Sequence, residues 1–466
     1  MESIEVSVCG GWSRSSDEGR RKTEGAKDSS REVRLFSTTE AMMAFRMIKM
    51  EEQMTQPIEK RQVWEAFKRV RTKGGAPGVD GVTIETVEAY PQKYLYPVWN
   101  RMASGSYFPK PVREVLIPKQ DGKKRPLGIP TVCDRVAQMV ITQELASVAE
   151  PQFSANSFGY RPGRGALDAV GQCRLNCMRN NWVIDLDIKG FFDNIDHRLM
   201  MRAVRRFTTK KHILLYVKRW LEAPVVKEDG RLEQKQGKGT PQGGVISPLL
   251  ANMFLHLAFD KWIEENYPGL PYERYADDII VHCKTYGQSL DILTEIRKRL
   301  TACRLELHPE KTKIVYCKRN QKKHPTLKEM QITFTFLGYE FKPRWVRNKY
   351  GKYQLAFLPA VSAKAKQYIL SELRRMKLHR WVTASIEDIA GRLAPKLRGW
   401  INYFGRYHPS ELRIVFHLLN LRLFKWVRKK YKRFKRRKSE QVWKWLKSVY
   451  ALKPNLFPHW EFGVHP

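Results

Sequence analysis

Two acidic segments about ninety residues apart carry the side chains most able to do chemistry. In the run WVIDLDI, apolar residues alternate with Asp185 and Asp187, and such alternation places both carboxylates on one face of a β-strand. Asp277 and Asp278 stand at the predicted tip of a hairpin in RYADDIIVHC. If the two strands pair, these carboxylates lie close together, where each raises the pKa of its neighbours unless a cation neutralises them.

Magnesium is the cation that such a carboxylate cluster suits best. Mg²⁺ prefers oxygen ligands and keeps open positions for substrate phosphates. Two ions about 3.5–4 Å apart would activate a 3′-hydroxyl and stabilise a leaving pyrophosphate, so we expect two Mg²⁺, with Mn²⁺ as a substitute. Any one of these aspartates by itself is better explained as a turn cap, but their combination favours a metal site for nucleotidyl transfer.

Three further segments predict a nucleotide pocket. Lys119 and Arg125 stand six residues apart across a DGKK turn, from which they could hold a triphosphate. The run GTPQGGVISPLL places a glycine-rich loop before a helix, where backbone amides and Gln242 could contact a base pair or phosphate. Phe191 and Phe192 follow the first acidic strand, where a ring could exclude a ribose 2′-hydroxyl. The plain alternatives are a helix-entry turn for the loop and core packing for the rings.

Strands and helices alternate through the middle of the chain, which predicts an α+β domain with an antiparallel sheet. In this middle region we expect helices at 198–222, 249–265 and 290–300 and a strand at 332–341. After about residue 345 no further strand is predicted. Three helices at 361–377, 386–404 and 409–430 then indicate a separate bundle.

Composition limits the partners. The 466 residues are enough for roughly three domains, and 85 Lys and Arg against 47 Asp and Glu give a net charge of +38. That charge predicts a polyanionic partner. An anionic membrane surface is the alternative, but no spanning segment, secretory signal or lipidation motif supports it.

The seven cysteines are scattered along the chain and predict no disulfide framework. Cys173 and Cys177 have helical i,i+4 spacing, and we expect them to be buried thiols without His or Cys partners. We therefore expect a reduced, soluble, intracellular protein.

The motifs resemble those of a known family. RPLGIPTVCDR, SFGYRPGR, DIKGFFDNIDH, GTPQGGVISPLLANMFL, RYADD and FTFLGYEF are similar, in order and spacing, to the reverse transcriptase blocks of group II intron-encoded proteins. RLAPKLRGWINYFGRYH resembles the maturase, or X, domain of the same family. The resemblance covers roughly residues 55 to 430.

This resemblance implies a right-hand polymerase with an antiparallel palm sheet, followed by a helical thumb that doubles as the maturase domain. The expected domains are a flexible leader at 1–50, fingers and palm with an amino-terminal extension at 51–345, thumb and maturase domain at 346–438, and a basic tail at 439–466 that is a candidate remnant of a DNA-binding region.

The resemblance also assigns the catalytic carboxylates. Asp187 is implied as the first metal ligand, with Ile188 beside it, and Asp277 as the second, with Asp278 as its partner. Asp185 lies two residues too early on the strand and is expected behind the ion site.

The nucleotide contacts are assigned in the same way. Lys119 and Arg125 match the fingers residues that contact the triphosphate, and Phe192 matches the aromatic residue that discriminates the sugar. Gln242 matches a glutamine of the templating pocket. Lys311 matches a lysine near the leaving group.

A basic run predicts where RNA binds. Residues 421–438 hold eleven Lys or Arg and no acid, and Phe424, Trp426, Tyr431 and Phe434 are interleaved as rings for stacking. A solvated face or an import-like tract is the alternative. The RNA contacts that we expect are Lys396, Arg398, Arg428, Lys429, Lys432 and Arg433.

The function implied is an RNA-directed DNA polymerase that copies intron RNA into cDNA and binds its intron RNA to assist splicing and mobility. Its partners would be group II intron RNA, an RNA template, a DNA primer or target and dNTPs. A membrane is not expected as a partner, and a homodimer is left open. The resemblance implies a protein of the bacterial cytoplasm, associated with ribonucleoprotein or nucleoid. No cysteine follows Cys317, so we expect no H-N-H endonuclease and priming from an existing 3′ end.

Two rival functions remain. One is a domesticated reverse transcriptase of the retron, diversity-generating or CRISPR-associated kind, although the segment RGWINYF and the amino-terminal extension favour the intron protein. The other is a splicing factor built on an inactive polymerase. The intact Asp187, Asp277 and Asp278 favour an active enzyme over that scaffold.

Overall fold

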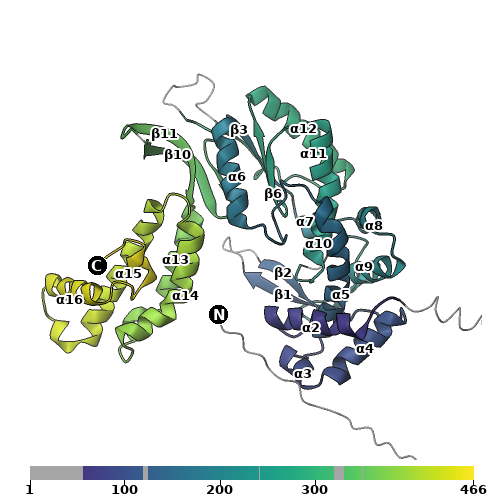
Figure 1. The fold of residues 1–466 in the computed structure, drawn as a ribbon, viewed down its shortest axis with the longest axis horizontal. Coiled ribbons are helices and arrows are strands. Elements are labelled where there is room, and N and C mark those ends of the chain that lie inside the picture. Colours follow the sequence, from purple (N-terminus) through teal and green to yellow (C-terminus); the bar gives the residue numbers. More distant parts are fainter. Residues whose placement is uncertain (1–55, 119–123, 241, 320–329, 349) are drawn as a thin grey trace, which may run out of the picture. The chain divides into compact units, whose positions relative to one another are not determined.

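The two acidic segments lie side by side in a four-stranded antiparallel sheet of order β6–β7–β3–β8 (Figure 1). The protein is described by a computed structural model over residues 56–118, 124–240, 242–319, 330–348 and 350–466. The sheet consists of β3 (Trp182–Asp187), β6 (Tyr272–Tyr275), β7 (Asp278–Cys283) and β8 (Lys313–Tyr316). The predicted strand, the predicted hairpin and their pairing are confirmed.

Both faces of this sheet are covered. Ile184 and Leu186 point to the large core beneath helices α10 to α12, whereas Val183 and Ile280 belong to a second apolar cluster that includes helix α6. Strands buried on both faces need apolar residues at nearly every position. In β7 the one residue that is not buried is Asp278, at the strand end next to the β6–β7 turn.

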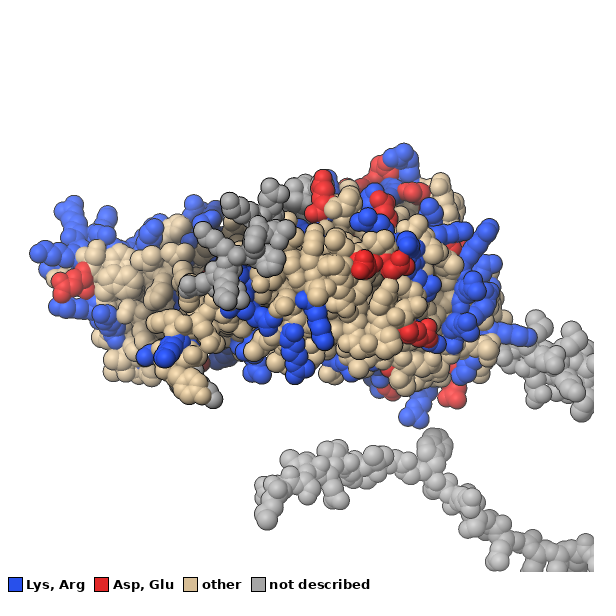
Figure 2. Space-filling view, turned by 90° about the horizontal axis from the view of Figure 1, so that it is seen from above, with Lys and Arg blue, Asp and Glu red and all other residues tan. Residues whose placement is uncertain are grey.

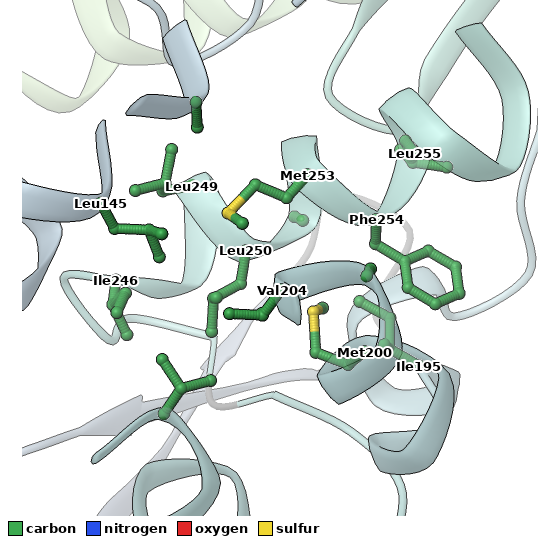
Figure 3. Packing of buried hydrophobic residues seen from close by; sticks show 14 of the residues in the cluster. Leu145, Ile195, Met200, Val204, Ile246, Leu249, Leu250, Met253, Phe254 and Leu255 are labelled. Carbon is green, nitrogen blue, oxygen red and sulfur yellow. The ribbon is translucent and has the colours of Figure 1, made fainter. Parts of the chain in front are cut away.

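The helices that surround this sheet come from the amino-terminal and middle parts of the sequence. They are α2 (Lys60–Lys73), α3 (Ile84–Ala89), α4 (Pro91–Ala103), α5 (Val132–Ala149), α6 (Ala166–Arg179), α7 (Phe191–Asn194), α8 (His197–Phe207), α9 (Lys211–Glu222), α10 (Ser247–Leu255), α11 (Lys261–Asn266) and α12 (Tyr286–Ala302), with a 3₁₀ turn at Glu150–Gln152. Eight of the nine residues of α10 are buried, so this helix is part of the core. Figure 3 shows its Leu249, Leu250 and Met253 among side chains of α5 and α8.

A second sheet, of order β2–β1–β4–β5, carries the expected nucleotide-contacting hairpin. Its strands are β1 (Val112–Pro118), β2 (Lys124–Ile129), β4 (Val225–Val226) and β5 (Leu232–Glu233). The turn that joins β1 to β2, and with it Lys119, lies outside the described residues.

Three of the predicted elements differ in the structure. The helix predicted at 198–222 is divided into α8 and α9. The helix predicted at 249–265 contains a π-helical turn, His256–Asp260, between α10 and α11. The strand predicted at 332–341 is a hairpin of β9 (Phe334–Phe336) and β10 (Tyr339–Arg347), because Leu337 and Gly338 both have positive φ, as a two-residue hairpin turn requires.

The expectation that strands end near residue 345 is wrong. β10 continues to Arg347 and pairs along its whole length with β11 (Tyr353–Val361). The boundary expected at 345 therefore falls inside a strand. The leader expected at 1–50 lies outside the described residues, and the domain limits stay a prediction.

The predicted three helices of the carboxy-terminal region are confirmed as α13 (Ala363–Arg375), α14 (Ile386–Phe404) and α15 (Ser410–Lys430). The segment expected as a basic tail folds as well. It forms α16 (Ser439–Leu452) and α17 (Pro458–Glu461), and its Leu446 and Trp460 are buried in the same apolar cluster as α15. Short 3₁₀ turns lie at Leu378–Arg380 and Lys432–Phe434. None of the helices described here is long and apolar enough to cross a membrane.

Two of the four rings expected to stack on RNA are core residues. Trp426 is fully buried and its Nε1 donates a hydrogen bond to the Trp381 carbonyl at 2.8 Å, and Phe434 is buried as well. The helical periodicity of α15 explains this, because Trp426 follows Leu419 and Leu423 on the buried face. Phe424 and Tyr431 are half-buried.

We expect Trp426→Ala to lower the free energy of unfolding by about 3–5 kcal/mol, because it removes a large buried side chain. Leu452→Ala is the control, since this leucine is 81% exposed and its loss should change stability by less than about 0.5 kcal/mol. Urea unfolding measures both variants. A fully stable Trp426→Ala protein with weakened RNA binding would contradict the core assignment.

Candidate active site

Strand pairing brings the predicted carboxylates together. Asp187 at the end of β3 is the direct cross-strand partner of Asp278 at the start of β7. Asp277 precedes Asp278 in the two-residue turn between β6 and β7. Ala276, the first residue of that turn, has a φ of +56°, a conformation that is unfavourable for a residue with a Cβ and that persists only where the surroundings enforce it.

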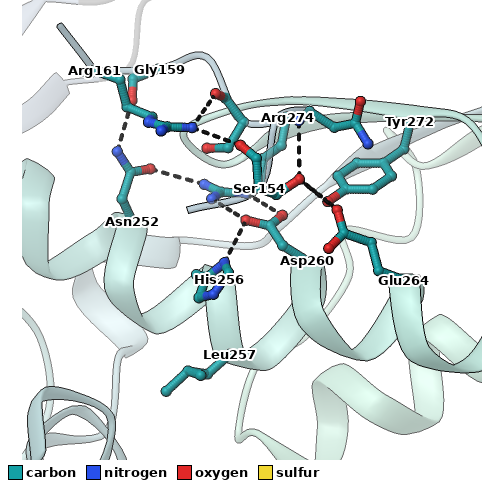
Figure 4. A network of polar contacts seen from close by, with 12 residues as sticks. Ser154, Gly159, Arg161, Asn252, His256, Leu257, Asp260, Glu264, Tyr272 and Arg274 are labelled. Atoms are coloured by element: carbon teal, nitrogen blue, oxygen red, sulfur yellow. Dashed lines mark hydrogen bonds and ion pairs between the residues drawn. The ribbon is translucent and has the colours of Figure 1, made fainter. Parts of the chain in front are cut away.

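A buried arginine enforces this turn. Arg274 is fully buried, and its guanidinium donates to the two Asp260 carboxylate oxygens at 2.7 and 2.5 Å (Figure 4). Its Nη1 also donates to Asn252 Oδ1 at 2.9 Å and to the Ala276 carbonyl at 3.2 Å. The charged group therefore ties the turn backbone to helix α10 and to the π-helical turn that carries Asp260.

A close contact between the backbones of Gly159 and Ala276 also supports the turn. The Nδ2 of Asn252 donates to the Gly159 carbonyl at 2.7 Å. A Cβ on Gly159 would lie 2.4 Å from the Ala276 nitrogen, so only glycine fits there. Sequence patterns alone do not reveal this network, although the aspartate in the apolar run LLANMFLHLAFD is a signal for it.

The carboxylates carry negative charge that Lys311 compensates only in part. Burial raises the pKa of Asp278 to about 6, with a further contribution from Asp277 and Asp187, against an opposing effect of Lys311. Burial and Asp278 raise the pKa of Asp185 to about 7. The pKa of Asp277 is also raised by burial and by Asp187. Mutual repulsion of this kind is relieved by a bound cation.

The donor set fits a divalent metal. Ile188 lies opposite Leu307 in a bridge that uses the Asp187 carbonyl and the Lys189 amide, so the Ile188 carbonyl points to the other side of its strand. Among the described residues, the oxygens of the three aspartates do not all lie within 4.8 Å of one another.

Two of the residues expected to contact the nucleotide, Arg125 and Gln242, are hydrogen-bonded to each other. Arg125 Nε donates to Gln242 Oε1 at 2.6 Å, and Gln242 Nε2 donates to Asp193 Oδ1 at 3.3 Å. The Gln242 carbonyl accepts from the Gly128 amide at 2.7 Å. These contacts attach the glycine-rich loop to the β1–β2 hairpin.

The other nucleotide residues lie nearer the carboxylates. Lys311 Nζ is 3.1 Å from Asp187 Oδ2. Phe192 lies in the short helix α7, which follows β3, and is 8% exposed. Its ring packs edge-on against that of Phe191, with 5.2 Å between the two ring centroids. Its carbonyl accepts from the Thr240 amide at 2.8 Å, which joins the end of β3 to the glycine-rich loop.

The residues expected to bind RNA are spread over the carboxy-terminal helices. Lys396 on α14 pairs with Glu372 at 3.0 Å, and Arg398 is exposed on the same helix. Arg428 lies over the Phe424 ring and donates to the Lys435 carbonyl. Three further basic residues, Lys429, Lys432 and Arg433, are exposed.

Two family models match the chain. Residues 117–341 match "Reverse transcriptase (RNA-dependent DNA polymerase)" and residues 366–445 match "Group II intron, maturase-specific domain". Protein YkfC of Escherichia coli is 32% identical over 328 residues, covering 62% of this chain and 81% of the relative.

This chain belongs to the family of group II intron-encoded reverse transcriptases and maturases. Other relatives are the group II intron-encoded protein LtrA of Lactococcus lactis, 34% identical over 42% of this chain, and the putative COX1/OXI3 intron 1 protein of Saccharomyces cerevisiae, 30% identical over 53%. The chain spans 33% and 29% of their lengths. As a reverse transcriptase, the intron-encoded protein is an RNA-directed DNA polymerase of a family that uses divalent metal ions.

We expect Arg274→Met to lower the stability of the intron-encoded protein by about 3–5 kcal/mol, because the buried Asp260 carboxylate loses both of its guanidinium hydrogen bonds. The double variant Arg274→Met/Asp260→Leu should lose less than the sum of the single variants. Lys444→Met is the control, since its pair with Glu440 is exposed and contributes at most about 1 kcal/mol. Additive losses in urea unfolding would contradict this coupling.

We expect Asp278→Asn to stabilise the metal-free protein at about pH 8 by roughly 1–2 kcal/mol, since Asp278 is exposed and solvent screens part of the repulsion. A pKa raised to about 6 means that the folded state binds more protons than the unfolded state, so wild-type stability falls as pH rises from about 4 to 6. Below about pH 4 the two proteins should be equally stable. Urea unfolding at both pH values tests this, with the exposed Asp291→Asn as control. Destabilisation at the higher pH would show that the carboxylate does not repel its neighbours.

Proposed function

We propose that this chain copies RNA into DNA at Asp187, Asp277 and Asp278 and that it assists the splicing of its own intron. The observation that carries the proposal is the cross-strand pair of Asp187 and Asp278, with raised pKa values on the neighbouring carboxyl groups. Such a group costs folding free energy and is retained at sites that use it.

The side chains of the three aspartates and the Ile188 carbonyl would hold two Mg²⁺ ions, or Mn²⁺ as a substitute. When bound, such ions supply activation of the primer 3′-hydroxyl and stabilisation of the leaving pyrophosphate. The buried Arg274–Asp260 pair keeps Asp277 in place during the cycle. Asp185, whose pKa is raised to about 7 by burial and by Asp278, lies behind this set on the same strand face.

The incoming dNTP would be bound by the hairpin and loop residues. Arg125 is the expected triphosphate ligand, together with Lys119, and it would exchange its contact with Gln242 for the phosphates. Gln242 would then contact the templating base pair. Lys311 would place its positive charge beside the leaving pyrophosphate, and the Phe192 ring would exclude a 2′-hydroxyl.

The positive charge supports RNA as the macromolecular partner. On the face shown in Figure 2, Lys and Arg side chains outnumber Asp and Glu, and the whole chain carries +38. We propose that Arg398, Lys396 and the basic residues after α15 bind phosphates of group II intron RNA. If about eight phosphates are neutralised, log Kd should vary with log salt concentration with a slope of about 5–7.

We expect Asp277→Ala to reduce primer extension on an RNA template with Mg²⁺ and dNTPs by at least about a hundredfold, because a metal-binding carboxylate is lost. Intron binding and splicing should change little, since they depend on other residues. Asp291→Ala, on an exposed part of α12, serves as the control for both assays.

The outcomes separate the rival functions. Loss of synthesis and splicing together in a folded Asp277→Ala protein would contradict the division between the two activities. A folded wild-type chain that binds the intron but makes no cDNA would indicate a splicing factor on an inactive polymerase. Synthesis without any preference for intron RNA would indicate a domesticated reverse transcriptase.

A further inference from the structure

A second cluster of ligand-type side chains lies within the palm, separate from the three catalytic aspartates. Cys173 of α6, Glu273 of β6 and His282 of β7 each contribute an atom to a group in which all atoms lie within 4.8 Å of one another. All three residues have no solvent exposure. The expectation that Cys173 and Cys177 are buried is confirmed, but the expectation that they lack partners is wrong.

The polar contacts of this cluster are incomplete. His282 Nε2 is hydrogen-bonded to Glu273 Oε2 at 2.7 Å, and Glu273 Oε1 accepts from Asn176 Nδ2 at 2.5 Å. The other ring nitrogen of His282, Nδ1, is buried and has no hydrogen-bond partner of acceptable geometry within the described ranges. Nε2 is thus the ring nitrogen that faces the Glu273 carboxylate, whereas Nδ1 lies on the Cys177 side of the ring.

The thiol of Cys177 lies next to this cluster. Cys177 lies one helical turn after Cys173 and is also fully buried. Its side chain interacts with those of Cys173, Cys317 and His282. The cluster thus offers two thiols of α6, a carboxylate of β6 and an imidazole of β7, with the Cys317 thiol next to Cys177.

We propose that Cys173, Cys177, His282 and Glu273 bind a zinc-class divalent cation. Zinc takes Cys, His and carboxylate ligands in a tetrahedral arrangement whose ligand atoms are about 3–4 Å apart. The grouping of Cys173, Glu273 and His282 within 4.8 Å approaches that spacing, and Cys177, which lies outside the grouping, would complete the tetrahedron. The Asn176 amide would hold the Glu273 carboxylate in orientation, as outer hydrogen bonds do at metal centres. This set shares no residue with the catalytic carboxylates.

Binding would change the protonation of the cluster. Burial raises the pKa of Cys173 and of Cys177 to about 12, so both are thiols in the metal-free protein. Burial lowers the pKa of His282, but the facing Glu273 carboxylate outweighs it and keeps the ring charged. The cation would replace both thiol protons and one imidazolium proton, and all three would pass to solvent.

Binding of the ion would connect three elements of the palm. The ion would join α6 to β6 and β7, which are the two strands whose connecting turn carries Asp277. A structural ion adds to folding free energy because its ligands are assembled only in the folded chain. It would therefore stabilise the hairpin that presents the catalytic carboxylate without touching the reacting atoms.

Elemental analysis of the full-length chain tests this proposal. The protein is produced in zinc-supplemented medium and purified under reducing conditions without chelator, because the site is closed to solvent. We expect about one zinc per chain in the wild type and less than about a fifth of that in Cys173→Ala and Cys177→Ala. Cys283→Ala is the matched control, since Cys283 is equally buried and adjacent to His282 but belongs to the other apolar cluster.

Two further measurements exclude other metal sites. Asp277→Ala should retain its zinc, which separates this site from the catalytic carboxylates. The cobalt-loaded wild type should show a thiolate-to-metal charge-transfer band that Cys173→Ala lacks. A folded wild type without zinc, full zinc in Cys173→Ala, or a disulfide among these cysteines would each overturn the proposal, whatever the polymerase activity.

Discussion

Repulsion between carboxylates at the end of two paired strands is the constraint on which the palm depends. Asp187 faces Asp278 across β3 and β7, and Asp277 follows in the turn. A shift of one residue in the strand register would move Asp187 to the opposite face of the sheet. The register is fixed because both faces are packed with apolar side chains, so the burial of residues such as Ile184 and Val281 opposes the electrostatic cost.

The turn needs a second support because apolar packing ends where the charges begin. Arg274 provides it without adding net charge, since the Asp260 carboxylate matches its guanidinium. A buried pair of this kind contributes little net stability against apolar residues of the same size, but it fixes geometry through several directed hydrogen bonds. The π-helical turn that carries Asp260 is itself held by Arg299, which donates to the Leu257 and Ala258 carbonyls.

Local pattern was sufficient to predict the elements that carry the carboxylates. Alternation in WVIDLDI and the apolar run after Asp278 define strands whose pairing follows from their acidic ends. The same reasoning failed where a turn lacked a familiar signal, as at Leu337, whose positive φ is unusual for a residue with a Cβ. It also failed for Trp426, since a basic and aromatic composition does not reveal which ring faces the core.

Contacts distant in sequence were beyond that reasoning. Cys173 and His282 are more than a hundred residues apart, and only the packing of α6 on β6 and β7 brings them together. The pair Arg274–Asp260 was equally hidden, because each residue taken alone is an ordinary charged side chain. In both cases a charged or polar residue inside an apolar run was the available signal, and its partner required the fold.

The maturase-specific region is joined to the palm by the same helix α6. On α14, Tyr403 donates to the Leu337 carbonyl at 2.8 Å and its own carbonyl accepts from Tyr339. Tyr407 follows α14 and donates to the Leu167 carbonyl of α6 at 3.2 Å. Movement of α14 when RNA binds would thus act on α6, which packs against the strands that present Asp277. An RNA contact on the helical region and the geometry of the carboxylates are therefore linked by a short series of packed elements.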